Sequence, residues 1–280
     1  GTSPQSPVAV SFANRSVDAR FNDRDVPLLA AITNLTELGL QNTQVTDAGL
    51  KQLGRLPNLL KLHLRSPQIT DASLRELKPL TGLTELYLGH NKITDAGLKE
   101  LGTLTHLTVL HLDSTAITDA GLPKIGKLRK LRELNLARTQ ITDAGLKHLK
   151  TLHDLWELDL SGTRITDAGL AQIGGLTKMY KLWLDNVPIT DAGLKELAPF
   201  QSLERCWIEH TQVTDAGLKE LKRLVSLQRL YLDGNRITDA GVQDLKEFKN
   251  LTILELGSTE ITEAGIKELR QSLPNTKIVR

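Results

Sequence analysis

Cysteine and aromatic residues are both scarce in this sequence. Its 280 residues include one cysteine, Cys206, so no disulfide can form within the chain. The disulfide-clasped caps of many extracellular proteins are therefore excluded, although export is not. Aromatic residues make up 4% of the chain, as three Trp, three Tyr and four Phe, so the positions at which they occur are informative.

An excess of charge of one sign and long apolar runs are also absent. Lys plus Arg number 35 and Asp plus Glu number 33, which gives a net charge of +2. This balance argues against a nucleic-acid-binding or membrane-surface protein. No apolar run approaches the roughly 20 residues of a membrane-spanning helix, and residues 1–7 (GTSPQSP) lack the core of a signal peptide. We expect a soluble monomer without membrane insertion and leave its compartment unassigned. Residues 1–7 are interpreted as a flexible linker, an expression-tag remnant or the end left by upstream processing.

The chain is rich instead in one repeated unit. An acidic residue, usually within the motif ITDAG, recurs every 24 residues. These acids are Asp47, Asp71, Asp95, Asp119, Asp143, Asp167, Asp191, Asp215, Asp239 and Glu263. We predict a single domain in which residues 8–34 form a degenerate N-terminal cap, with a first strand at residues 8–12 and a loop at residues 14–20. Residues 35–273 form ten units and residues 274–280 form a C-terminal capping strand.

Each unit divides into a strand half and a helix half. In residues 83–89 apolar residues alternate with polar ones, so Leu86 and Leu88 point inward while Tyr87 points outward. Residues 95–104 have Leu at three- and four-residue spacing, which predicts an amphipathic helix of two to three turns. Neither half can bury its apolar side alone. Stacked units would give an α/β fold, a right-handed solenoid or horseshoe with a parallel β-sheet on the concave side and short helices on the convex side.

The unit L-x-x-L-x-L-x-x-T-x-I-T-D-A-G-L-K-x-L resembles the leucine-rich repeat over roughly residues 21 to 273. Its helical half is similar to the repeats of F-box-type and ribonuclease-inhibitor-like proteins, with Thr where those usually have Cys, and we expect a bacterial-type repeat protein. The resemblance implies a solenoid scaffold used with many partners. No residue before Leu35 resembles an F-box, so ubiquitin-ligase function is not carried over.

The recurrent polar residues predict structural roles. The Thr–Asp pair before each helix can cap unpaired N–H groups and complement the helix dipole, so the acidic row is not interpreted as a catalytic or metal site. The Thr or Asn at the ninth position, such as Thr43 and Asn91, is expected to join neighbouring turns. Gly49 and its equivalents are interpreted as a close-packing requirement, with Ser73 as the one substitute.

Function is sought at the outward strand positions, because we expect those side chains to be free of folding roles. All Tyr and Trp residues lie on or beside the predicted sheet. Phenylalanine instead occupies inward positions, where Phe21, Phe200 and Phe248 replace the aliphatic residues of other repeats. Three consecutive repeats place basic, aromatic and acidic residues in parallel rows. These rows are Lys181, Arg205 and Arg229; Trp183, Trp207 and Tyr231; and Asp185, Glu209 and Asp233. Like charges on neighbouring strands disfavour folding, so a complementary partner would explain the rows.

We therefore predict a non-enzymatic scaffold without cofactor or metal that binds a protein or peptide partner on its concave face. Tyr87, Trp156 and Tyr180 join the three rows as predicted contact residues, with His210, Asp159 and Glu255 as a possible rim. Two other functions stay open: a glycan or small-molecule receptor that uses the same aromatic patch, and a structural or self-associating module. In a third interpretation, the basic and acidic rows pair diagonally across the aromatic row through salt bridges and cation–π contacts, and their only effect is to keep the surface soluble.

A second cluster contains His63, Tyr87, His111 and Asp113. The two histidines lie two strands apart, so their backbones are expected roughly 10 Å from each other, with Tyr87 between them. That separation is long for one shared ion, and no nucleophile is paired with a base. These residues are interpreted as polar contacts on the sheet. Cys206 takes the place of an inward Leu and is predicted to be buried and unreactive.

Overall fold

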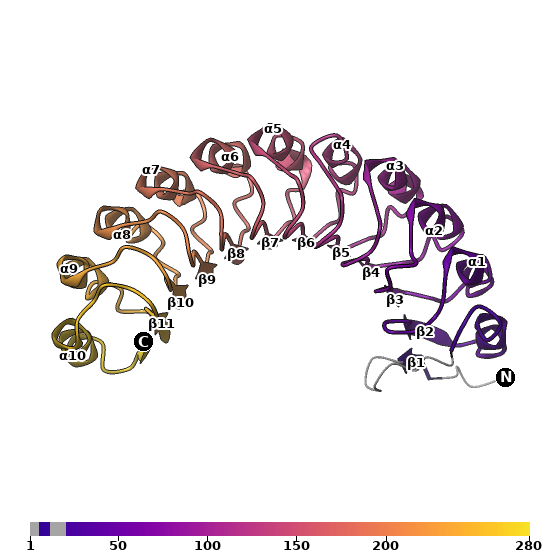
Figure 1. The fold of residues 1–280 in the computed structure, drawn as a ribbon, viewed down its shortest axis with the longest axis horizontal. Coiled ribbons are helices and arrows are strands. Elements are labelled where there is room, and N and C mark those ends of the chain that lie inside the picture. Colours follow the sequence, from indigo (N-terminus) through magenta and orange to yellow (C-terminus); the bar gives the residue numbers. More distant parts are fainter. Residues whose placement is uncertain (1–5, 12–20) are drawn as a thin grey trace. The chain divides into compact units, whose positions relative to one another are not determined.

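The computed structural model describes residues 6–11 and 21–280. The chain forms two compact units, Gly1–Asn135 and Leu136–Arg280. In the described residues each unit has six parallel strands, which follow one another in chain order and form a sheet. The helices of each unit all lie on the same side of this sheet (Figure 1). The leucine-rich-repeat architecture predicted for the chain is confirmed, whereas the assignment of residues 8–280 to a single domain stays a prediction.

In the first unit every strand pairs in parallel with the next one along the chain. The strands are β1 (Val8–Ser11), β2 (Leu35–Gly39), β3 (Lys61–His63), β4 (Glu85–Tyr87), β5 (Val109–His111) and β6 (Glu133–Asn135). The helices are α1 (Asp47–Leu50), α2 (Asp71–Glu76), α3 (Asp95–Leu98) and α4 (Leu122–Ile125), with 3₁₀ helices η1 (Val26–Ala31), η2 (Leu53–Arg55) and η3 (Lys99–Thr103). The predicted first strand is confirmed for Val8–Ser11. Phe12 and the predicted loop 14–20 lie outside the described residues.

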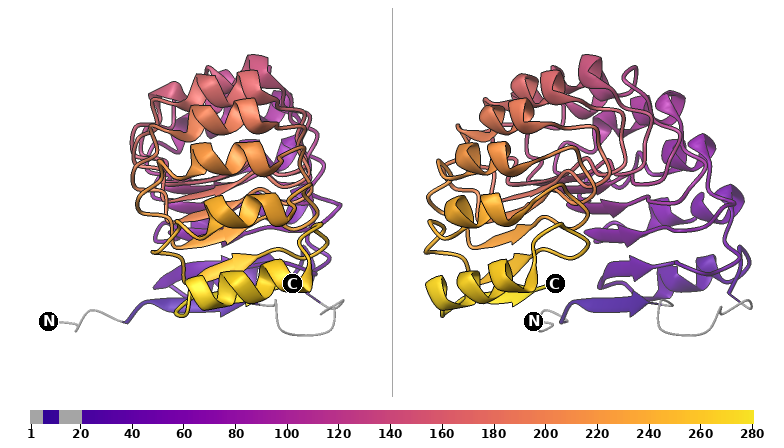
Figure 2. Two further views of the ribbon diagram at one scale, coloured as in Figure 1. Left: turned by 90° about the vertical axis from the view of Figure 1, so that its left-hand side faces the viewer. Right: turned by 60° about the vertical axis from the view of Figure 1, so that its left-hand side comes forward.

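The second unit has the same organisation, and its helices run parallel to one another (Figure 2). Its strands are β7 (Glu157–Asp159), β8 (Lys181–Trp183), β9 (Arg205–Trp207), β10 (Arg229–Tyr231), β11 (Ile253–Glu255) and β12 (Lys277–Val279). Its α-helices are α5 (Asp143–Leu146), α6 (Asp167–Ile173), α7 (Asp191–Leu194), α8 (Asp215–Leu221), α9 (Val242–Leu245) and α10 (Glu263–Ser272). Its 3₁₀ helices are η4 (Leu149–Thr151), η5 (Lys195–Leu197) and η6 (Asp239–Gly241). The predicted closing strand is present as β12.

The helical halves have about the predicted length but are partly 3₁₀ instead of wholly α-helical. α3 has four residues and is followed directly by the five-residue η3, and α7 with η5 repeats this pattern. In the described chain α6 and α8, at seven residues each, and α10, at ten residues, come closest to the predicted α-helix of two to three turns. A repeat of 24 residues must also supply a strand and two connections, so little chain is left for the helix, which ends in tighter 3₁₀ geometry.

The core of each unit is formed by the inward residues of strands and helices. In the strands of the second unit Leu182, Leu230 and Leu254 are fully buried, and Cys206 takes the place of a leucine among these inward residues, as predicted. Phe200 and Phe248 are also buried, whereas Phe21 is half-buried. The alternate residues of each strand face away from the helices, and we call this surface of a unit its sheet face.

Aspartate and threonine join consecutive repeats in a way that the sequence did not reveal. Thr214 caps α8 as predicted, because its hydroxyl accepts the N–H of Ala216 at 3.3 Å. The carboxylate of Asp191, however, reaches the next repeat, where it accepts the N–H of Thr214 at 2.8 Å and its hydroxyl at 2.7 Å. This carboxylate would lie 2.4 Å from a Cβ on Gly217, so the recurrent glycine is needed for close packing, as predicted.

The expected role of the ninth position is confirmed for asparagine and for Thr211, whose hydroxyl donates to the Asn235 side chain of the next repeat at 2.8 Å. Asn91 donates to the carbonyl groups of Leu64 and Leu88 at 2.9 and 2.8 Å, and so joins two turns. The hydroxyl of Thr43 instead donates to Leu40 of its own turn at 2.8 Å. A threonine hydroxyl has one donor on a short side chain, whereas the asparagine amide has two donors, so the Thr43 hydroxyl donates to the local carbonyl alone.

Candidate functional site

Three aromatic side chains form a stack on the sheet face of the second unit. Trp183, Trp207 and Tyr231 end β8, β9 and β10 and are register partners in the sheet. The ring centroids of Trp183 and Trp207 are 4.3 Å apart with an interplanar angle of 11°, and those of Trp207 and Tyr231 are 4.7 Å apart at 6°. These spacings follow from the distance of about 4.8 Å between strands. We call these three residues the aromatic ladder.

Stacking determines which parts of the aromatic ladder reach solvent. Both faces of Trp207 are covered by its two neighbours, and all three side chains are half-buried. Because the ring planes are parallel, the remaining faces look along the row at its two ends. The free face of Trp183 is directed toward β7, where its register partner is Asp159, and that of Tyr231 toward β11, where its partner is Glu255. The ladder therefore offers ring edges along its length, and the outer ring face at each end lies beside an acidic residue.

A second aromatic pair lies beside the strands. Trp156 and Tyr180 stack with centroids 5.9 Å apart and an interplanar angle of 28°. Trp156 is 40% exposed, which makes it one of the few exposed large apolar side chains in the described chain. Lys181 Nζ and Arg205 Cζ each lie 5.8 Å from the Tyr180 ring centroid. The basic row thus contacts Tyr180, as expected for cation–π interactions.

The basic and acidic rows are not paired with each other. Lys181 forms an ion pair with Glu157 on the preceding strand. Among the described residues, no carboxylate lies within ion-pair distance of Arg205 or Arg229. Diagonal salt bridges across the aromatic ladder are therefore absent from the described part of the chain, although the cation–π contacts to Tyr180 are present. Arg205 instead lies over the Tyr180 ring.

The acidic row has a structural role that was not predicted. Asp185 accepts the backbone N–H of Glu209 at 2.9 Å, and Asp233 accepts that of Gly257 at 2.8 Å. The expectation that outward side chains are free of folding roles is therefore wrong for these two residues. Burial raises the pKa of Asp185, and Glu209 has a raised pKa because of burial and then the charges of Asp185, Asp233 and Glu255.

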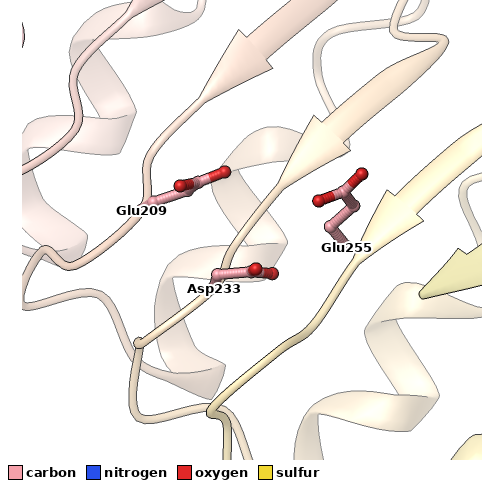
Figure 3. A group of neighbouring side chains, drawn as sticks. All are labelled: Glu209, Asp233 and Glu255. Atoms are coloured by element: carbon pink, nitrogen blue, oxygen red, sulfur yellow. The ribbon is translucent and has the colours of Figure 1, made fainter. Parts of the chain in front are cut away.

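Three carboxylates of neighbouring segments gather at one end of the ladder. Glu209 follows β9, Asp233 follows β10 and Glu255 ends β11, and their side chains lie on the same face (Figure 3). One oxygen of each lies within 4.8 Å of the others, and all three residues are half-buried. We call them the carboxylate cluster. Glu255 was predicted only as part of a rim, although its register with Tyr231 follows from the repeat spacing.

The first unit holds Tyr87 and the predicted histidine cluster. The Tyr87 ring stacks on His63 at 4.0 Å and 7° and meets His111 edge-on at 4.7 Å and 67°. Its hydroxyl donates to Glu85 at 2.9 Å. Tyr87 therefore separates the two histidines, as predicted, and burial lowers the pKa of His63.

These rings border a polar hollow, where His90 lies 3.3 Å from Asp113. Tyr87 lies in the first unit, whereas the other predicted contact residues lie in the second unit.

Comparisons with known proteins agree with this architecture. The family model described as leucine-rich repeat region matches residues 94–278, and one described as leucine rich repeat matches residues 33–93. The chain belongs to the leucine-rich repeat family. Members of this family typically serve as protein-binding scaffolds and are generally non-catalytic. No curated protein matches the sequence of this leucine-rich repeat chain.

Several solved leucine-rich repeat structures are similar to this one. An internalin of Listeria monocytogenes has a TM-score of 0.70 at 26% identity, covering 91% of this chain and 76% of that one. A leucine-rich repeat protein of Leptospira interrogans has a TM-score of 0.61 at 22% identity, covering 91% and 74%, and shares the fold. Internalin C2 of Listeria monocytogenes has a TM-score of 0.50 at 25% identity, covering 92% and 91%. In residues 6–11 and 21–280, no helix has the length and apolar character needed to cross a membrane.

Proposed function

We propose that this leucine-rich repeat chain is a non-enzymatic scaffold that binds a protein or peptide on the sheet face of its second unit. The observation that carries the proposal is the aromatic ladder, three half-buried rings held in register on an open sheet. The predicted contact residues of this unit surround it. They are Trp156, Tyr180, Lys181, Asp185, Arg205, Glu209, Arg229 and Asp233.

The composition and rigidity of this face suit protein recognition. Trp, Tyr and Arg contribute most of the binding energy at protein interfaces, and here they occupy adjacent strands. The stacked rings already have few accessible rotamers, so a partner that docks on them loses little side-chain entropy. Arg205 and Arg229 have no ion pair among the described residues and can form charge-assisted hydrogen bonds to a partner.

The same geometry favours a peptide over a glycan. A sugar ring packs against the flat face of an aromatic ring, but both faces of Trp207 are covered within the ladder. Only one face of Trp183 and one face of Tyr231 are left for such contacts. The ring edges and flanking charges, in contrast, are accessible along the whole row and suit an extended or helical polypeptide.

The test is a selection from a random dodecapeptide library displayed on phage. The selected peptides are titrated against the chain while tryptophan fluorescence is followed. Replacing the ladder in a Trp183→Ala, Trp207→Ala, Tyr231→Ala variant should abolish binding. The control is Val225→Ala, because Val225 is 64% exposed but lies outside the sheet face.

The ladder variant could lose binding because it is less stable. A second variant, Arg205→Ala with Arg229→Ala, leaves the stacked rings in place and should also weaken binding. Peptides that bind the ladder variant and the wild type equally would refute the proposal. A response to oligosaccharides but not to peptides would support the receptor alternative instead.

Two finer expectations belong with this proposal. Tyr87, in the first unit, is proposed as a separate contact residue beside His63 and His111. The likeness of the repeats to the F-box-type and ribonuclease-inhibitor-like subtype stays a prediction, and no adaptor function in ubiquitin ligation is proposed.

A further inference from the structure

The carboxylate cluster lies at one end of the aromatic ladder, and in the described part of the chain no Lys or Arg pairs with it, although His210 acts to lower the pKa of Glu209. The chain contains 35 Lys and Arg residues, yet in its described part none is within ion-pair distance of Glu209, Asp233 or Glu255. Acids elsewhere on the sheet faces differ. Glu85 pairs with Lys61 at 2.7 Å, and Glu157 pairs with Lys181. The negative charge at this end of the ladder is therefore not compensated by lysine or arginine within the described chain.

Three half-buried carboxylates in this arrangement disfavour the folded state. Their oxygens lie within 4.8 Å of one another, on strands that are hydrogen-bonded neighbours. Like charges in such positions repel, and the raised pKa of Glu209 reflects that repulsion after the larger effect of burial. A cationic group from outside would relieve the repulsion, so charge complementarity specifies the sign of the partner.

The end of the ladder adds an aromatic face to this negative charge. Tyr231 is parallel to Trp207 within 6°, so its second face is directed toward β11. The register partner of Tyr231 on that strand is Glu255. A ring face beside a carboxylate suits the side chain of Lys or Arg, whose apolar stem packs on the ring while its charged group reaches the acid.

A metal ion fits the same residues less well. Calcium takes six to eight oxygen ligands, and the cluster offers three carboxylates, of which Asp233 already accepts the N–H of Gly257 at 2.8 Å. A metal ion also makes no use of the adjacent tyrosine face. We propose that this end of the sheet face docks a basic segment of a protein partner, with a Lys or Arg side chain lying on Tyr231 and ending on Glu209, Asp233 and Glu255.

This inference rests on the proposed function, because it names the partner class for the same sheet face. The test uses dodecapeptides selected on the wild-type chain and a variant that carries Glu209→Gln, Asp233→Asn and Glu255→Gln. The side-chain amide oxygen that Asp233→Asn introduces can still accept the Gly257 N–H, so the local fold is preserved. The matched control is Glu196→Gln, Glu247→Gln, Glu260→Gln. It changes the net charge equally at exposed acids away from the sheet face.

We expect the selected peptides to be enriched in Lys and Arg and to bind the cluster variant about tenfold or more weakly than the control. Added sodium chloride should weaken wild-type binding more steeply than binding to the cluster variant. Selected peptides without basic residues, or equal affinity for the cluster variant and its control, would overturn the inference. The proposed function would still hold in that case if the ladder variant loses binding. If no peptide depends on the ladder, both fail. Quenching by calcium chloride alone, with displacement of peptide, would identify a metal site instead.

Discussion

The contact between Asp191 and Gly217 allows a direct test of how consecutive repeats are joined. The Asp191 carboxylate accepts two hydrogen bonds from Thr214, at 2.8 and 2.7 Å. A Cβ added to Gly217 would lie 2.4 Å from Asp191 Oδ1 and 2.9 Å from Leu194 Cδ1. The same carboxylate thus bonds the next repeat and occupies the space that a side chain at position 217 would need. The two residues should therefore be energetically coupled.

The magnitudes follow from these contacts. Asp191→Ala removes two charge-assisted hydrogen bonds and leaves a half-buried N–H without its partner, which should cost about 2 kcal/mol. Gly217→Ala displaces the carboxylate and breaks the same bonds. Alanine recovers about 1 kcal/mol of helix propensity within α8, which leaves a net cost of about 1 kcal/mol or more. In the double variant the carboxylate is already gone, so the total should be about 1 kcal/mol instead of the additive sum of about 3 kcal/mol.

Urea unfolding followed by both circular dichroism and tryptophan fluorescence measures this cycle. Two probes are needed because repeat arrays do not always unfold in one step. All three tryptophans lie in the same unit as the substitutions. Gly175→Ala is the control, because its Cβ would meet nothing within 4 Å, and it should be neutral or slightly stabilising. Additive costs in the double variant, or a Gly217→Ala as benign as Gly175→Ala, would refute the role assigned to the carboxylate.

Two further predictions concern titratable groups of the second unit. Burial and neighbouring carboxylates raise the pKa of Glu209, whereas His210 acts to lower it. Ionised Glu209 therefore destabilises the folded state, and this cost grows as the pH rises from the ordinary glutamate pKa through the raised value. Glu209→Gln should therefore raise stability by roughly 0.2–1 kcal/mol at neutral pH and by nothing in strong acid, and a difference in urea midpoints that stays constant with pH would contradict this. The Cys206 thiol is fully buried and burial raises its pKa, so a thiol reagent should label it only as the unit unfolds, and rapid labelling of the native chain would show that it is accessible.

The strand register and the aromatic ladder could be predicted because the repeat spacing is constant. When every unit has 24 residues, equivalent positions on adjacent strands become register partners, and Trp183, Trp207 and Tyr231 pair as expected. The inward position of Cys206 follows from the same alternation. These features depend on the backbone path alone, which periodicity determines.

The hydrogen bonds of outward and capping side chains could not be predicted in the same way. An acid at the first position of a helix can complement that helix or reach the next repeat, and the letters TDAG are compatible with both. Asp185 and Asp233 are outward by periodicity, yet each turns back to a neighbouring backbone N–H. Side-chain rotamers and the depth of each turn decide these contacts, and neither is encoded in a spacing.

The ladder has chemically different ends, and this difference follows from which charges the fold itself uses. At the Trp183 end, Lys181 is neutralised by Glu157 on the adjacent strand, and two carboxylates, Asp159 and Asp185, lie near each other. At the Tyr231 end, Glu209 and Glu255 have no lysine or arginine partner in the described chain, although Asp233 next to them helps to hold the following turn. Stacking removes the inner ring faces from recognition, so a partner can distinguish the ends more readily than the middle. A basic segment that follows the row would therefore place a cation at the Tyr231 end, where three carboxylates gather.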